Sequence, residues 1–141
     1  MTGERATRSA PRLAAVSALG LLVAGLAGCA PGTERCTELY STVIGAVDGV
    51  TSVEIDCSEQ FGGGWQRVDV QLATDDPDDA RAIGEAVLQA IAAEPEMDPQ
   101  WATPQDYYLE DGTEATIGLR ELGFNGIPTV REVREHYGIE P

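Results

Sequence analysis

The sequence predicts an α+β fold in which a four-stranded antiparallel sheet carries two main helices on one face. Apolar residues recur at intervals of three and four over residues 36–47 and 76–94, as in amphipathic helices. Apolar and polar residues alternate, as in half-buried strands, over residues 50–57, 66–74, 107–109 and 114–119. A short helix follows, so the order helix, strand, strand, helix, strand, strand, helix predicts a two-layer sandwich.

The first helix and the first strand each carry one cysteine on the apolar side. Cys36 shares its helical stripe with Tyr40 and Val43, and Cys57 shares its strand face with Ile55. Both thiols are therefore expected to point into the interface between the two elements, which favours a Cys36–Cys57 disulfide. A reactive thiol pair is the alternative, whereas a zinc site would need further ligands at regular spacing.

The second strand and the second helix follow a glycine-rich turn. In residues 66–74, alternate apolar residues point inward, so this strand forms a hairpin with the first. Asp76 suits the capping position of the next helix, and Pro77 suits its first turn. The surrounding acids, Asp75, Asp78 and Asp79, could instead bind calcium, but they lack the alternate spacing and central glycine of a calcium loop. The run is interpreted as a helix start.

The C-terminal part contains three local signals. Asp111 and Gly112 favour a tight turn between the third and fourth strands. Thr129 and Glu132 have the spacing of a capping box, and Gly138 suits the end of that helix. The order of elements resembles that of permuted ferredoxin-like folds, a likeness that implies a fold and no function.

The first 28 residues have the parts of a secretory signal. Arg5, Arg8 and Arg12 supply a positive end. The apolar stretch that follows, residues 13–26, is shorter than the roughly 20 residues of a transmembrane helix. The leader is therefore expected to direct export without spanning the membrane permanently.

The end of this leader resembles the lipobox of bacterial lipoproteins, which is a leucine, a small residue, a glycine or alanine, and a cysteine. Leu26, Ala27, Gly28 and Cys29 match all four positions. The resemblance implies a diacylglyceryl group on Cys29, cleavage before it, and palmitate-type acyl chains that anchor the protein to the bilayer. An ordinary signal peptide that contains a cysteine is the alternative.

These expectations divide the chain into three parts. Residues 1–28 are the cleaved signal, residues 29–35 a lipidated tether, and residues 36–141 a single acidic α+β domain. The expected location is the extracytoplasmic side of the cell membrane, where an oxidising environment supports the disulfide.

The charge of the chain restricts its partners. It has 24 acidic residues, nine arginines and no lysine, and loss of Glu4 and three arginines with the leader leaves 23 acids against six arginines, a net charge of −17. Nucleic acid is excluded because its phosphates require a basic surface. Anionic headgroups are excluded as a direct contact for the same reason. A partner with basic patches, or a cation, fits this charge.

Three aromatic residues are candidates for binding a partner. Phe61 and Trp65 flank three glycines at the predicted hairpin tip, where aromatic side chains favour contact surfaces. Tyr108 is expected to point away from the core if Tyr107 points inward. The alternative is that these aromatics cover the sheet or complete the core.

Two arrangements could support catalysis. His136 lies one helical turn from Glu132, and Glu54 or Asp56 faces Asp69 if the first hairpin has the right register. Neither is accompanied by a nucleophile motif, and no catalytic residue, metal or cofactor is expected. The predicted function is a non-catalytic binding or accessory lipoprotein of the bacterial cell envelope, with an unknown envelope protein or ligand as partner. The alternative is a small tethered hydrolase using paired carboxylates.

Overall fold

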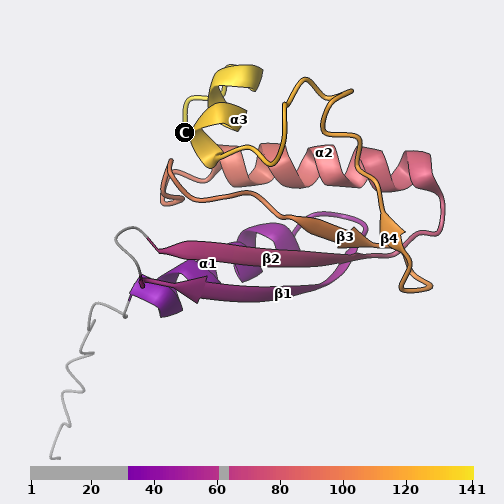
Figure 1. The fold of residues 1–141 in the computed structure, drawn as a ribbon, viewed down its shortest axis with the longest axis horizontal. Helices are drawn as coiled ribbons and strands as arrows, with labels where there is room; N and C mark the ends of the chain where they lie inside the picture. The colour runs from indigo at the N-terminus through magenta and orange to yellow at the C-terminus, as the bar shows by residue number, and fades with distance from the viewer. Residues whose placement is uncertain (1–31, 61–63) are drawn as a thin grey trace, which may run out of the picture.

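The computed structural model describes residues 32–60 and 64–141, so the predicted leader, Cys29 and Phe61 lie outside the described residues. The fold is α+β, as predicted, and the elements follow the predicted order (Figure 1). They are α1 (Gly32–Gly45), β1 (Val50–Ser58), β2 (Trp65–Leu72), α2 (Pro77–Ala93), β3 (Asp106–Tyr108), β4 (Glu114–Ala115) and α3 (Val130–Tyr137).

The first helix begins four residues earlier than its apolar stripe predicts, at Gly32 instead of Cys36. Glu34 in the first turn stabilises this extension because a carboxylate favours the positive end of the helix dipole. Residues 32–35 therefore belong to the helix, although they were predicted to be part of the tether.

The sheet is mixed, and the prediction of a purely antiparallel sheet is wrong. Its strand order is β1-β2-β3-β4, with antiparallel pairs at β1–β2 and β3–β4 and a parallel pair at β2–β3. The reason lies in the connection between β2 and β3. It contains α2 and the loop after it, and such a helical crossover returns the chain to the end of the sheet where β2 began.

Two strands also differ in detail from their sequence patterns. The register of β1 shifts between Val50 and Ser52, so Val50 faces Leu72 and Thr51, expected inward, is exposed. Strand β4 has two residues instead of the six expected. It ends early because Gly118 adopts a positive φ of 73° just beyond Ile117, whose side chain packs over Gly84 of α2.

The predicted caps of α2 and α3 are confirmed. Asp76 caps α2 through Oδ1, which accepts the main-chain N–H groups of Asp78 and Asp79 at 2.8 and 3.2 Å. Thr129 and Glu132 form both halves of the capping box of α3, and Gly138 ends that helix in the left-handed conformation. These local signals depend on short-range hydrogen bonds, which is why the sequence predicts them well.

The core is built from residues of the sheet and the helices. It combines three inward residues of β2, Val68, Val70 and Leu72, with buried residues of α1 and α2. Tyr40 and Ile44 are the fully buried residues from α1 in this core, and Met97 from the loop after α2 joins them. A smaller cluster joins α2 to α3 through Leu88, Ala92, Phe124 and Val133.

Candidate functional site

The other side of the sheet is polar and is called the polar face here. Strand register and alternation place on it a set of residues from all four strands. They are Ser52, Glu54, Asp56, Ser58, Trp65, Arg67, Asp69, Gln71, Asp106, Tyr108 and Glu114. This set has five carboxylates and one arginine, so the polar face is acidic.

Arg67 organises the centre of the polar face. Its guanidinium lies 3.5 Å from Asp69 Oδ2 and 3.2 Å from Asp106 Oδ2. The other carboxylate oxygen of Asp69, Oδ1, is buried and has no hydrogen-bond partner within the described residues. Glu54 and Asp56 are exposed and unengaged by any ion pair in this part of the chain. The acids of β1 are therefore available to a basic partner.

The predicted contact residues Trp65 and Tyr108 both lie on the polar face but are not brought together. Trp65 is 44% exposed at the start of β2, opposite Ser58. Tyr108 faces Gln71, six residues further along β2, a separation of about 20 Å at strand rise. Partial desolvation, with the charges of Asp106 and Asp69 nearby, raises the pKa of the Tyr108 hydroxyl. Phe61 lies outside the described residues.

The carboxylate pair considered from the sequence occurs in part. Glu54 is directly opposite Asp69, whereas Asp56 is opposite Arg67. Asp69 is part of an ion pair, because its Oδ2 lies 3.5 Å from Nε of Arg67.

The other polar motifs serve local structure. Asp75 Oδ1 accepts the N–H of Asp111 at 3.0 Å, which joins the start of α2 to the β3–β4 turn. Glu132 belongs to the capping box, and the ring of His136 packs on Phe124 with centroids 4.6 Å apart. Within residues 32–60 and 64–141, no group of three or more His, Cys, Asp or Glu side chains could hold a metal ion.

The predicted disulfide is present. Cys36 and Cys57 are bonded, with their Cα atoms 6.3 Å apart, and the bond joins α1 to the end of β1. Cys36 is buried, as its position on the apolar stripe predicts. The two sulfur atoms form one wall of a cavity that the sequence did not reveal.

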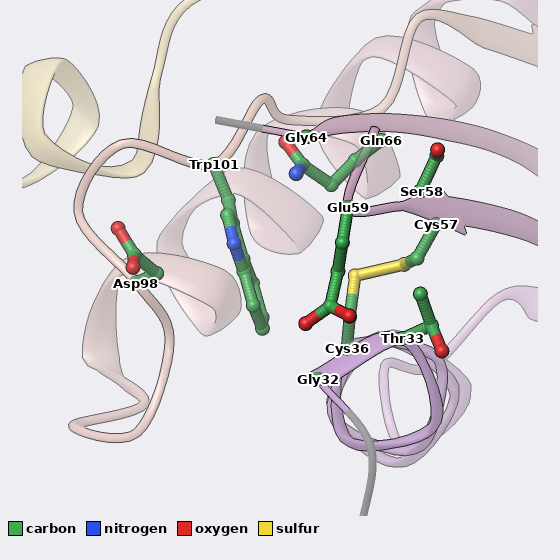
Figure 2. Close-up of a pocket in the computed structure, with 10 residues that line it drawn as sticks. All are labelled: Gly32, Thr33, Cys36, Cys57, Ser58, Glu59, Gly64, Gln66, Asp98 and Trp101. Carbon is green, nitrogen blue, oxygen red and sulfur yellow. A yellow bond between two sulfur atoms is a disulfide. The ribbon is translucent and has the colours of Figure 1, made fainter. Parts of the chain in front are cut away.

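This cavity, called the Trp101 cavity here, has a volume of about 370 Å³ (Figure 2). Its lining comes from the first turn of α1, the ends of the hairpin strands and the loop after α2. The residues are Gly32, Thr33, Cys36, Cys57, Ser58, Glu59, Gly64, Gln66, Asp98 and Trp101. Both charged residues in this set are acidic, so the cavity has the same sign as the polar face.

The indole ring and a carboxylate face this space from opposite sides. Figure 2 shows the Glu59 side chain extending toward the first turn of α1, with the ring of Trp101 across from it. Glu59 lies so close to Gly32 that a β-carbon there would collide with its carboxylate. Trp101 stacks on Tyr40 with ring centroids 5.6 Å apart, and Asp98 accepts the N–H of Gln100 at 2.8 Å.

The wall of the cavity is held by further hydrogen bonds. The Tyr40 hydroxyl donates to the carbonyl of Ala102, and burial, with the charge of Asp98, raises the pKa of this hydroxyl. Gln66 Oε1 accepts the N–H of Ala102 at 3.0 Å. No short-range pattern in the sequence links Trp101 to Glu59.

A second cavity of about 480 Å³ lies between β3, β4 and the loop before α3. Tyr107 is part of its lining, and the Tyr107 hydroxyl is buried without a hydrogen-bond partner in the part of the chain that the structure describes. Burial raises the pKa of this hydroxyl above its ordinary value. The lining mixes Arg120 with Glu114 and Glu121, so it does not favour one charge of ligand.

No protein-family model, curated protein or solved structure matches the chain. Among the described residues, no helix combines the length and the hydropathy needed to cross a bilayer.

Proposed function

We propose that this protein is a membrane-anchored, extracytoplasmic lipoprotein that acts as a non-catalytic binding or accessory protein of the bacterial cell envelope. The lipobox-like residues that end in Cys29 support the anchor. The Cys36–Cys57 disulfide fits an oxidising compartment. The partner is an envelope protein or ligand with basic groups, and nucleic acid is excluded by the net charge of −17 after processing.

We further infer that α1 and α2 both cover the same face of the sheet, in a two-layer arrangement that leaves the polar face open. The supporting observation is the sharp alternation in β2. Val68 and Val70 are fully buried, whereas the Arg67 side chain between Trp65 and Asp69 is 61% exposed. A sheet that carries helices on one face commonly presents the other to water.

The observation that carries the binding function is the excess of carboxylates on the polar face next to an exposed aromatic side chain. Glu54 and Asp56 are exposed, and Trp65, opposite Ser58 on the neighbouring strand, is 44% exposed. Exposed tryptophan is enriched at contact surfaces, and complementary charge speeds and orients association. A hydrolase is less well supported because Asp69, the partner carboxylate of Glu54, is ion-paired with Arg67.

Mass spectrometry of the purified protein tests the anchor. The expected N-terminal residue is Cys29 with a diacylglyceryl group, found in the membrane fraction. An unmodified Cys29, or recovery of the chain from the cytosol, overturns the proposed location.

Crosslinking followed by affinity capture from membranes tests the surface. A Glu54→Gln, Asp56→Asn double variant and a Trp65→Ala variant are expected to lose partners that the unmodified protein captures. The matched control is Glu135→Gln with Glu140→Gln, which removes the same charge from exposed positions on and after α3. Equal capture by all four proteins removes the polar face from the proposal.

A further inference from the structure

The Trp101 cavity is acidic, and its charged residues are not those of the polar face. It lies at the start of α1 and the end of β1, and its charged lining residues, Glu59 and Asp98, are both acidic. The neutral polar residues Thr33, Ser58 and Gln66 also line the cavity. The cavity therefore favours a positively charged occupant.

The size and the wall of the cavity favour an organic cation over a bare metal ion. A water molecule takes about 30 Å³ in the liquid, whereas the cavity has about 370 Å³. One side is the indole ring of Trp101, held by its stack on Tyr40, and another is the Cys36–Cys57 disulfide. Aromatic faces attract ammonium groups, and nearby carboxylates add the counter-charge.

The geometry points to a binding site for an organic ammonium group in the Trp101 cavity. The group lies between the indole of Trp101 and Glu59, and Asp98, on the other side of the ring in Figure 2, adds a second negative charge nearby. Glu59 and Asp98 are both exposed, so both carboxylates are accessible from solvent. Gln66 is already oriented by its bond from Ala102, which leaves its position fixed before a ligand binds.

The position of the cavity in the chain indicates where the ammonium group could come from. The lipid source rests on the proposed function, because it requires the anchor at Cys29. Gly32 lines the cavity and is three residues from Cys29 in the sequence. Three residues span at most about 11 Å, so lipidation of Cys29 holds the cavity next to the headgroup layer. An ammonium group can then come from the headgroup of a neighbouring lipid or from a free amine, and both present the same chemistry.

The two tryptophans of the chain make the site measurable. A Trp65→Phe variant leaves Trp101 as the only indole, so its fluorescence reports on the cavity. Choline and ethanolamine, added to the protein in a neutral detergent, are expected to change this fluorescence saturably. The uncharged analogue of choline, 3,3-dimethylbutan-1-ol, is expected to have no effect at the same concentrations.

Charge-neutral variants test the carboxylates. Asp98→Asn keeps the oxygen that accepts the N–H of Gln100, and Glu59→Gln keeps the length of the side chain. Each is expected to raise the half-saturating choline concentration about fivefold, the order of effect of one nearby charge. Glu110→Gln, at the exposed β3–β4 turn, is the matched control and is expected to change nothing. Unchanged titrations in the two cavity variants, or equal binding of the uncharged analogue, overturn the site.

Vesicles distinguish the two sources of ammonium. The Trp65→Phe protein is reconstituted into vesicles of phosphatidylglycerol alone or mixed with phosphatidylethanolamine. A Trp101 response only in the mixed vesicles assigns the site to lipid headgroups. A response to soluble choline without that difference assigns it to free amines, and no response in either arm overturns the inference. The detergent titration does not require an anchor, so failure of lipidation is detected separately.

Discussion

The guanidinium of Arg134 donates through Nε to the main-chain carbonyl of Ala92 at 2.9 Å, and so connects α3 to the last turn of α2. Its Nη2 also donates to the carbonyls of Glu94 and Met97 at 2.7 and 3.2 Å. One side chain thus satisfies carbonyl groups that the end of a helix leaves without partners.

Replacing Arg134 with alanine is expected to lower the free energy of unfolding by about 2 kcal/mol, because charge-assisted hydrogen bonds to partly buried carbonyls are lost. Arg134→Lys is expected to recover only part of this, since lysine lacks the planar fork. Urea denaturation measures both. Arg131→Ala, an exposed neighbour on α3, is the control, and an equal loss in that variant contradicts the assigned role.

Reduction of the disulfide is expected to lower the free energy of unfolding by about 3 kcal/mol, the value for closing a loop of roughly this length. The bond joins residues 21 positions apart. Urea denaturation with and without reductant measures the change. A Cys36→Ala, Cys57→Ala protein should be as unstable as the reduced one and insensitive to reductant, whereas a reductant effect in that protein assigns the loss to another cause.

Removal of the hydroxyl group is expected to have different effects on stability at the two buried tyrosines, Tyr40 and Tyr107. Tyr40→Phe is expected to cost about 1 kcal/mol because the bond to the Ala102 carbonyl is lost. Tyr107→Phe is expected to be neutral or stabilising, since the Tyr107 hydroxyl is buried without a partner among the described residues. Thermal and urea denaturation of both variants check the contrast, which an equal loss would contradict.

The same tyrosines predict a loss of stability at alkaline pH. Burial raises the pKa of both hydroxyls above the ordinary value of 10.0, so ionisation is favoured in the unfolded chain. The contribution of the two protonated hydroxyls to the free energy of unfolding is fully present below about pH 10, where the unfolded chain also keeps both protonated. It is lost as the pH rises further. The Tyr40→Phe, Tyr107→Phe double variant should show a shallower decline of melting temperature between pH 9 and 11 (about the range of tyrosine titration). Parallel curves would contradict the assignment.

Gly84 allows the segment after β4 to pack on α2. A β-carbon at this position would lie 2.5 Å from Cγ2 of Ile117, so Gly84→Ala is expected to cost about 1 to 3 kcal/mol through overpacking. Adding Ile117→Ala should relieve the collision. The double variant should therefore lose less free energy of unfolding than the sum of the losses in the two single variants. Additive effects in a double-mutant cycle would show that the two side chains do not compete for this space.

The sequence predicts the elements that depend on local chemistry. The caps at Asp76 and Thr129 are encoded within four residues of the helix they begin, and the disulfide follows from two apolar faces that each carry a cysteine. The parallel β2–β3 pair was missed because alternation describes one strand at a time and says nothing about its neighbour's direction. The long connection through α2 was the signal that favours a parallel pair.

Of the candidate sites too, the parts that depend on local pattern were predicted and the parts that depend on tertiary packing were not. Tyr108 was expected to point away from the core by alternation, and Trp65 was expected at the hairpin tip; the strand register places both on the polar face. The Trp101 cavity was not predicted because Glu59 and Trp101 are 42 positions apart and both lie outside regular elements. Only tertiary packing brings them to the same space.

Strand β1 forms one end of the sheet, and none of the other strands in residues 32–60 and 64–141 lies along its outer edge. Such edges recruit copies of themselves, and nine residues are enough to begin a cross-β stack. Here the central side chains on one side of β1 are Glu54 and Asp56, so a second molecule arriving in the same way would meet its own carboxylates. Electrostatic repulsion between these carboxylates thus opposes edge-to-edge pairing of two copies.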